Sequence, residues 1–235
     1  MQSTGRIALD PRLSMIASLV GRCRCCADIG CDHGRLGAFL LQSGQCEHMQ
    51  LTDISEPSLK KARMLLYGLG LSDRADFCVG DGAQALSAPA DVAVVAGMGG
   101  VTIADILREG RQKLGEARLV LQPNVAAPQL RGELSRLGYR ITDERVAQDG
   151  RRNYVVIAAV PGRSDYGLKA RVVGPVLLER MPEELEPYAR FRLRVAKKAL
   201  EGAATARDGS QTAPLEQEIE IWEEVCECLQ RRNRC

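Results

Sequence analysis

The sequence predicts an α/β fold built on a mainly parallel sheet, and three observations lead to this prediction. Up to about residue 160, short apolar runs of strand length alternate with amphipathic stretches of helical length, the pattern of repeated β-α units. Aromatic residues make up only 4% of the chain, whereas a β-sandwich depends on aromatic and β-branched strands. The hairpin signal Asp149-Gly150 ends the alternation, so an antiparallel hairpin should close a parallel sheet that is covered on both faces.

The expected elements follow from these patterns in chain order. Apolar residues at helical spacing predict a first helix over 13–20, and an apolar run ended by Gly30 predicts a strand over 25–29. Ser55 is a suitable N-cap, and Pro57 fits the first turn of the helix that follows. The further strands are expected at 48–52, 76–79, 92–96, 118–122, 139–147 and 154–160, and the further helices at 36–41, 55–66, 101–114 and 127–137.

A change of composition at Pro161-Gly162 divides the chain into residues 1–162 and residues 163–235. The second part is charged, shows no convincing strand, and has two stretches with apolar residues at 3-4 spacing. They predict a helical hairpin of coiled-coil type with its turn at 202–214 and a kink or restart at Pro187. The first stripe is Met181, Leu185, Tyr188, Val195 and Ala199, interrupted by Arg192, and the second is Leu215, Ile219, Trp222, Cys226 and Leu229.

The charge balance and the nine cysteines limit the class of protein. A net charge of +2 excludes a tail that coats nucleic acid indiscriminately, but it leaves room for a local basic face. No secretory segment or membrane span is evident, so we expect a cytoplasmic protein with reduced cysteines and no membrane partner. Zinc is the alternative, but Cys25 and Cys26 point to opposite faces of a strand, and Cys226 and Cys228 lie roughly 200° apart on a helix. We therefore expect no metal.

The predicted strands end in polar and glycine-rich segments. In an open parallel sheet these ends meet at the edge where ligands bind. Gly30 and Gly34 allow a sharp turn and a close approach of a ligand to the backbone. Asp53 could accept hydrogen bonds from both ribose hydroxyls, and Asp81 from an exocyclic amine. The segments are Asp28-Ile29-Gly30-Cys31-Asp32-His33-Gly34, Asp53-Ile54-Ser55, Gly80-Asp81-Gly82, Gly97-Met98-Gly99-Gly100 and Gln122-Pro123-Asn124.

The acids of the first loop decide between two adenosine-bearing ligands. A dinucleotide needs bare helix N–H groups facing its pyrophosphate, and Asp28 and Asp32 would repel that anion. Carboxylates suit a ligand that carries an ammonium and a sulfonium group. The sequence therefore favours S-adenosylmethionine.

These motifs resemble those of class I S-adenosylmethionine-dependent methyltransferases, and more closely the bacterial family that methylates N1 of adenosine 22 in tRNA. The resemblance covers residues 6–162, and the tail is similar to that family's C-terminal extension. Arg35 and Gly37 depart from it, since an aromatic residue and a proline are expected there. The matching segments are Ala27–Gly34 (with the Asp32-His33 pair), Ala96–Gly100, Leu121–Asn124, and Asp149-Gly150 followed by Tyr154.

The resemblance implies a Rossmann-like fold and a set of site residues. For the cofactor these are Asp28, Gly30, Asp32, His33, Gly34, Asp53, Ile54, Asp81, Gly82, Gly97, Met98 and Gly99. For catalysis they are Asp32, Asn124 and Tyr154. Asp32 would stabilise positive charge on the adenine or accept an N6 proton, unless it binds the cofactor ammonium or caps a helix. Asn124 would orient the base or cap the next helix, and Tyr154 would stack on the adenine or be a buried hairpin residue.

Adenine N1 lies on the Watson–Crick edge, so the target must be exposed and the RNA held by phosphate and shape. Two alternatives stay open: a methyltransferase of another RNA, a protein or a small molecule, and a non-catalytic cofactor- or RNA-binding module. We expect a monomer. The candidate basic contacts to tRNA are Arg6, Arg12, Arg151, Arg152, Arg190, Arg192, Arg194, Lys197 and Lys198, and Glu183, Glu184 and Glu186 dilute the tail's charge.

Overall fold

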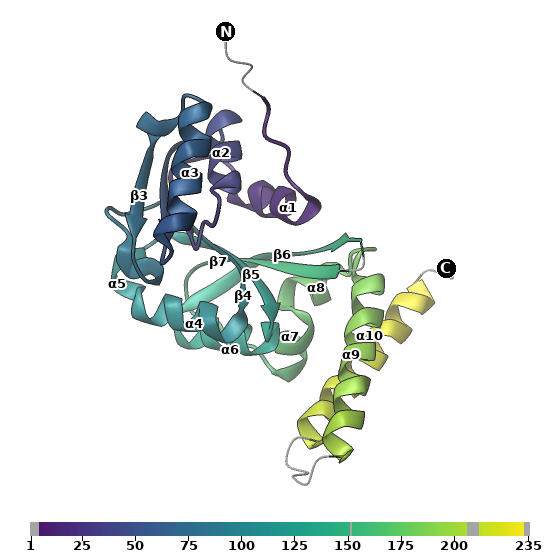
Figure 1. Ribbon diagram of the computed structural model, residues 1–235. Coiled ribbons are helices and arrows are strands. Elements are labelled where there is room, and N and C mark those ends of the chain that lie inside the picture. Colours follow the sequence, from purple (N-terminus) through teal and green to yellow (C-terminus); the bar gives the residue numbers. More distant parts are fainter. Residues whose placement is uncertain (1–4, 151, 206–211, 233–235) are drawn as a thin grey trace.

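The computed structural model describes residues 5–150, 152–205 and 212–232, and its strands form one sheet with helices on both faces (Figure 1). The strands are β1 (Cys23–Ile29), β2 (Cys46–Asp53), β3 (Ala75–Val79), β4 (Val92–Gly99), β5 (Arg118–Val125), β6 (Tyr139–Asp149) and β7 (Arg152–Pro161). The helices of the first part are α1 (Pro11–Val20), α2 (Arg35–Gln42), α3 (Glu56–Gly68), α4 (Gly100–Glu109), α5 (Arg111–Leu114) and α6 (Ala127–Arg136), with short 3-10 helices η1 (Ser72–Arg74) and η2 (Gly82–Ala85). The helices of the tail are α7 (Leu168–Val173), α8 (Pro175–Arg180), α9 (Leu185–Thr205) and α10 (Thr212–Arg232).

The sheet has the order β3-β2-β1-β4-β5-β7-β6. The five strands β1 to β5 run parallel, and β7 pairs antiparallel with both β5 and β6. The strand order reverses between β1 and β4, and a crevice at such a switch point is where open α/β sheets bind ligands. The predicted parallel sheet with a closing hairpin is therefore confirmed.

Local capping and packing explain where the helices of the first part begin and end. The Ser55 hydroxyl accepts a hydrogen bond from the Ser58 N–H at 3.3 Å, which confirms the predicted N-cap. The helix predicted over 101–114 is instead two helices, α4 and α5, which meet at Gly110. A Cβ at Gly110 would lie 2.3 Å from the Cβ of Ala83, so this glycine lets η2 pack against the break.

Two hydrophobic clusters cover the two faces of the sheet. One cluster contains buried side chains of α1, α2 and α3, together with residues of β1 and β2 such as Cys26 and Leu51. The other contains side chains of α4 and α6, and it continues into α7, α8, α9 and α10 through residues such as Val173, Leu185 and Trp222. The C-terminal tail thus shares one apolar core with the sheet.

A buried ion pair attaches α7 and α8 to the sheet. The sequence patterns did not predict these two short helices. Arg131 of α6 donates to Glu144 of β6 over 2.7 Å, and both side chains are fully buried. The Arg131 guanidinium also donates to the carbonyls of Arg171 and Val172, while the second Glu144 oxygen accepts from the Val176 N–H. The ion pair joins α6 to β6, and its remaining hydrogen bonds tie the start of the tail to both elements.

The two long helices α9 and α10 pack side by side as the predicted hairpin (Figure 1). Tyr188 meets Trp222 edge to face with ring centroids 5.9 Å apart. The apolar stripe of α10 is confirmed for Ile219, Trp222, Cys226 and Leu229, which are buried. Helix α9 runs to Thr205 and α10 begins at Thr212, so both helices extend into the predicted turn, whose Asp208-Gly209-Ser210 lies outside the described residues.

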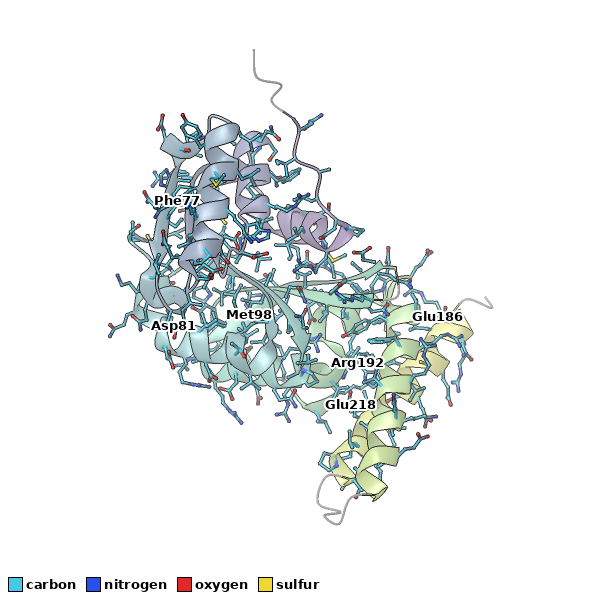
Figure 2. The ribbon with its side chains drawn as sticks, viewed as in Figure 1. Phe77, Asp81, Met98, Glu186, Arg192 and Glu218 are labelled. Carbon is cyan, nitrogen blue, oxygen red and sulfur yellow. The ribbon has the colours of Figure 1, made fainter. Side chains whose placement is uncertain are left out.

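The stripe predicted for α9 is partly wrong. Met181 precedes the helix as the cap of α8, and α9 starts afresh at Leu185 with Pro187 in its first turn. Val195 and Ala199 face solvent, because the buried positions continue through Ala189 and Ala196 instead. Arg192 does not interrupt this stripe but belongs to it: its guanidinium donates to Glu218 of α10 over 2.7 Å (Figure 2).

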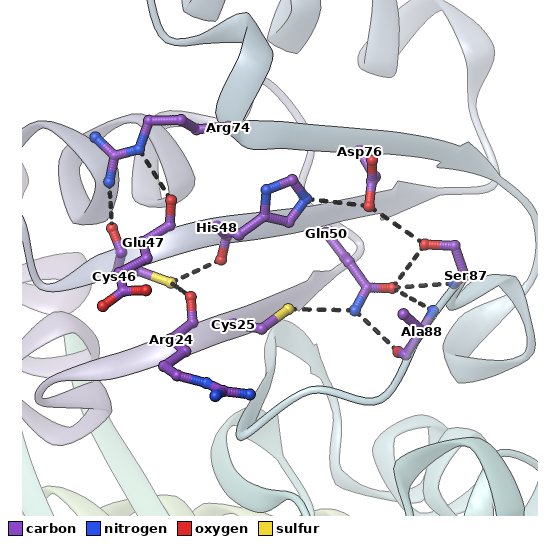
Figure 3. A network of polar contacts seen from close by, with 10 residues as sticks. All are labelled: Arg24, Cys25, Cys46, Glu47, His48, Gln50, Arg74, Asp76, Ser87 and Ala88. Carbon is purple, nitrogen blue, oxygen red and sulfur yellow. Dashed lines mark hydrogen bonds and ion pairs between the residues drawn. The ribbon is translucent and has the colours of Figure 1, made fainter.

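A polar network fixes the connection between η2 and β4 (Figure 3). The fully buried Gln50 of β2 accepts hydrogen bonds from the N–H groups of Ser87 and Ala88, and its amide N–H donates to the Ala88 carbonyl. The same amide donates to the sulfur of Cys25 on β1. A single buried side chain therefore replaces the backbone pairing that this loop lacks.

Within the described residues, no helix has the length and apolar character needed to cross a membrane. The eight cysteines of these residues are free, and no three metal-ligating side chains gather around a common point there.

Candidate active site

The loop after β1 is shaped by residues with left-handed backbone conformations. Gly30 has φ 75°, and a Cβ there would lie 2.3 Å from the terminal methyl of Met98. Gly34 has φ 68° and leaves room for Ala62 of α3. Asp32 between them also has a positive φ, 49°, and its N–H donates to the Asp53 carboxylate at 3.0 Å. The loop therefore turns sharply and is fastened to the end of β2.

A cavity of about 680 Å³ opens at this edge, beside the strand-order switch. Most of the residues predicted for the cofactor line it: Asp28, Gly30, Asp32, His33, Asp53, Ile54, Asp81, Gly82, Gly97 and Met98. Gly34 and Gly99 do not line it; they are the N-cap residues of α2 and α4. We call this space the donor cavity.

The acids of the donor cavity sit in different environments. Asp28 is only 5% exposed, and burial raises the pKa of its carboxyl to about 7, an effect that the Asp53 carboxylate reinforces and Arg12 opposes. Asp53 accepts from the N–H of Asp32 and, through its other oxygen, from the N–H of Ser55 at 2.8 Å. Asp81 precedes η2 without capping it, so its carboxylate remains available to a ligand. The lining thus has more carboxylates than basic side chains and suits a cationic ligand.

Asp32 and His33 form the outer lip of the donor cavity. The Asp32 side chain is 73% exposed, and the His33 Nε2 lies 3.4 Å from its carboxylate. The same Nε2 lies 3.1 Å from the Lys61 ammonium. The Asp32 carboxylate therefore lies at the mouth of the cavity, largely open to solvent and within reach of a ligand.

A second cavity of about 600 Å³ adjoins the donor cavity, and Arg12 and Gly97 line both. The other lining residues are Asn124, Arg152, Asn153, Tyr154 and Phe191. Asn124 and Tyr154 meet here because β7 runs antiparallel to β5: the register that pairs Leu121 with Ile157 places Asn124 opposite Tyr154. The start of β7 thus reaches the edge where the parallel strands end. We call this space the acceptor cavity.

A hydrogen-bond network forms the wall between the two cavities. The side-chain carbonyl of the fully buried Gln122 accepts from Arg12 at 2.9 Å and from the Gly97 N–H at 3.1 Å. The Gln122 amide donates to the Asn124 side-chain oxygen, and the Asn124 amide donates to the Gly97 carbonyl at 2.7 Å. The Arg12 guanidinium also lies 5.9 Å from the centroid of the Tyr154 ring. Asn124 is thereby held in one amide orientation.

The sequence patterns missed several residues that the fold brings to these cavities. Arg12 was expected to contact RNA, and nothing in its sequence context indicates a bond to Gln122. Thr102 and Ile106 line the donor cavity from α4, at positions that the pattern marks only as helical. Arg35, which departs from the family pattern, also lines this cavity and donates to the Ala8 carbonyl. At Gly37 a Cβ would lie 2.7 Å from Leu51, so α2 packs more closely on β2 than a proline would allow.

Known proteins match both the sequence and the fold. The family model described as a methyltransferase domain matches residues 9–157. The tRNA (adenine(22)-N(1))-methyltransferase of Bacillus subtilis is 31% identical over 161 residues, which are 68% of this chain and 68% of that protein. The crystal structure of the B. subtilis m1A22 tRNA methyltransferase TrmK superposes with a TM-score of 0.83 at 26% identity, covering 94% of this chain and 99% of that one. A proposed tRNA (m1A22) methyltransferase from Streptococcus pneumoniae, solved with S-adenosyl-L-methionine, has a TM-score of 0.83 at 26% identity and covers 93% and 100% of the two chains.

Sheet order, the acidic donor cavity and the matched domain define a class I methyltransferase. Within that class, the chain belongs to the family of bacterial tRNA (adenine(22)-N(1))-methyltransferases.

Proposed function

We propose that this protein transfers a methyl group from S-adenosylmethionine to N1 of an adenosine in tRNA, the adenosine at position 22. The observation that carries the proposal is the opposite charge of two adjoining cavities. Five aspartates line the donor cavity against two arginines, Arg12 and Arg35, whereas the acceptor cavity is lined by Arg12 and Arg152 and by no acidic residue of the part that the structure describes. A cationic donor and a polyanionic acceptor would each find the complementary side.

The donor cavity fits S-adenosylmethionine in shape and in donor set. Asp53 presents carboxylate oxygens at the end of β2, where they would accept from the ribose hydroxyls. Asp81 is available to accept from the exocyclic amine, and the apolar side chains of Ile54, Met98 and Ile106 would pack on the adenine. Asp28 and Asp32 would face the ammonium and sulfonium groups. When bound, the cofactor supplies an electrophilic methyl group on a sulfonium.

The chain's own task in the reaction is mainly one of positioning. Adenine N1 already carries an in-plane lone pair, so the acceptor needs alignment with the methyl carbon more than activation. Asn124, held by Gln122 and Gly97, would orient the base, and Tyr154 would stack on it. Positive charge appears on the adenine as the methyl group is transferred, and the exposed Asp32 carboxylate would stabilise it or accept an N6 proton.

The two parts of the chain would share this work. We assign the donor site to residues 1–162 and contacts with tRNA to both this part and residues 163–235, in a monomer that acts in the cytoplasm. Arg152 lines the acceptor cavity, and Arg194 lines a second hollow that shares Asn153 with it, so both offer cations to the RNA. Arg192 is ion-paired with Glu218 and is a poorer candidate, and Arg151 lies outside the described residues.

The proposal is tested with purified protein, labelled S-adenosylmethionine and an unmodified tRNA transcript, followed by mass spectrometry of the nucleosides. One methyl group should appear as 1-methyladenosine, and a transcript with guanosine at position 22 should accept none. Asp53→Ala should abolish transfer by weakening cofactor binding, whereas Asp73→Ala on the exposed η1 serves as the matched control. Transfer to a protein or small molecule but to no tRNA would favour the alternative acceptors, and cofactor binding without any transfer would favour the non-catalytic module.

A further inference from the structure

Phe191 of α9 is an aromatic side chain with no place in the core. It is half-buried, yet it packs against neither of the two hydrophobic clusters formed by the described residues. Its neighbours on the same helix do: Tyr188 and Ala189 are buried in the core, and Leu193 packs against it. Phe191 instead lines the acceptor cavity, whose other lining residues come from α1, β4, β5 and β7.

The helix that carries Phe191 is held rigidly. Arg192 is bonded to Glu218 over 2.7 Å, and Tyr188 meets the fully buried Trp222 edge to face. These contacts flank Phe191 on either side along α9. A side chain presented from such a helix loses little conformational freedom when a ligand packs on it.

The acceptor cavity has the chemistry of a nucleobase pocket. Tyr154 and Phe191 are its two aromatic side chains, and Arg12 already lies over the Tyr154 ring. Asn124 and Asn153 supply amide groups, and Arg152 supplies a cation for a phosphate. Bases stack on aromatic side chains without regard to sequence, and amides bond to base edges. The pocket also adjoins the donor cavity, and Arg12 and Gly97 line both spaces.

We propose that Phe191 is a substrate-positioning residue, against which the target purine packs while Asn124 faces its edge. The inference rests on the proposed function and extends it: the C-terminal hairpin completes the acceptor half of the active site. The hairpin would then contact the target base itself as well as more distant parts of the RNA. Because Phe191 does not itself line the donor cavity, its loss should leave cofactor binding intact.

The test compares Phe191→Ala and Phe191→Trp with Val195→Ala, a solvent-exposed position one turn further along α9. Single-turnover methylation of tRNA should slow about tenfold or more in Phe191→Ala, the range expected for the loss of one stacked base, and stay near the wild-type rate in the other two. The Kd for S-adenosylmethionine, measured by calorimetry, should change less than about twofold in all three. A purely structural role would instead lower the melting temperature and weaken cofactor binding together.

A second measurement applies even where Phe191→Ala folds poorly. A tRNA carrying 2-aminopurine at the methylated position should fluoresce less in its complex with the wild type than in its complex with Phe191→Leu, because stacking on the Phe191 ring quenches the base. Equal quenching by the two proteins, or a wild-type rate in Phe191→Ala, would overturn the inference while leaving the proposed function intact. If the wild type itself methylates no tRNA, the proposed function fails first.

Discussion

The guanidinium of Arg12 donates a 2.9 Å hydrogen bond to the side-chain carbonyl of Gln122, which ties α1 to the end of β5. The bond lies in the wall between the donor and acceptor cavities. The buried Gln122 side chain thus holds both α1, through Arg12, and the Asn124 amide, to which it donates a hydrogen bond.

Gln122→Ala should therefore lower kcat/KM for tRNA by about 10- to 100-fold, because both Arg12 and Asn124 lose their partner and the acceptor is misaligned. The free energy of unfolding should fall by about 1–3 kcal/mol, since buried donors are left unsatisfied. Steady-state kinetics and urea unfolding measure the two effects. Gln84→Ala, on the exposed part of η2, is the matched control, and an unchanged kcat/KM in Gln122→Ala would show that the network has no positioning role.

Cofactor affinity should depend on pH through Asp28, whose pKa is raised by burial to about 7 in the free protein. Below that pH the carboxyl is protonated and must release its proton to face the cationic donor. The Kd for S-adenosylmethionine should thus decrease as pH rises through about 7, by at most about tenfold per pH unit below it. Calorimetry in buffers of different ionisation enthalpy would detect the released proton, and Asp28→Asn should bind without this pH dependence.

The same raised pKa has a consequence for stability with the opposite sign. An unfolded Asp ionises near pH 4, so below that pH Asp28 is protonated in both the folded and the unfolded protein and does not affect folding. As the pH rises further, the unfolded state ionises while folded Asp28 stays protonated, and the resulting loss of stability grows until about pH 7. Asp28→Asn should raise the melting temperature of the ligand-free protein at pH 8 and leave it nearly unchanged at pH 3.5. A melting temperature lowered at both pH values would mean that Asp28 stabilises the loop in some other way.

Glu144→Ala should destabilise the protein by about 3–5 kcal/mol, because it leaves the fully buried Arg131 cation without its partner. Urea unfolding followed by tryptophan fluorescence is a suitable readout, since Trp222 lies in the core that this ion pair joins. Glu133→Ala removes a carboxylate paired with the half-exposed Arg108 and should cost less than about 1 kcal/mol. Similar losses in the two variants would contradict this account of the buried pair.

Charge on α9 should matter for tRNA binding only where no carboxylate neutralises it. Arg190 is bonded to Glu186, and Lys197 to Glu223 at 2.7 Å, whereas Arg194 and Lys198 form no ion pair with any residue that the structure describes. Replacing Arg194 and Lys198 by Ala should weaken tRNA binding and reduce the slope of log K against log salt by about 2. The double variant of Arg190 and Lys197 should change the slope less, and the reverse order would show that the tRNA lies along the other side of the helix.

The sheet, its hairpin and the acidic strand ends could be predicted from the sequence, because each depends on local patterns: alternating apolar runs, a turn dipeptide, and carboxylates at fixed places after strands. The contact between Arg12 and Gln122 could not, since it joins residues 110 positions apart through a buried side chain that no periodicity distinguishes. The break between α4 and α5 at Gly110 could not be predicted for a related reason. It allows Ala83 of η2 to pack against Gly110, and these two residues are close in space but not in sequence.

The tail shows the same limit more clearly. In the sequence Arg192 interrupts an apolar stripe, yet in the structure it pairs with Glu218 on α10, the helix that follows the turn. The burial of Arg131 and Glu144 likewise depends on two short helices, α7 and α8, that the sequence patterns did not predict. The burial of a charged residue can be explained only when the position of its ion-pair partner in the fold is known.

The apolar core that runs without a break from β4 into α10 has a practical consequence for anyone who would re-engineer this enzyme. A chimera that grafts a foreign tail after residue 162 must replace more than an RNA-binding appendage. It must rebuild the surface on which Val173, Leu185 and Trp222 rest, or the truncated sheet will present that surface to solvent and tend to aggregate. Retargeting is therefore better attempted by exchanging side chains along α9 than by swapping whole segments.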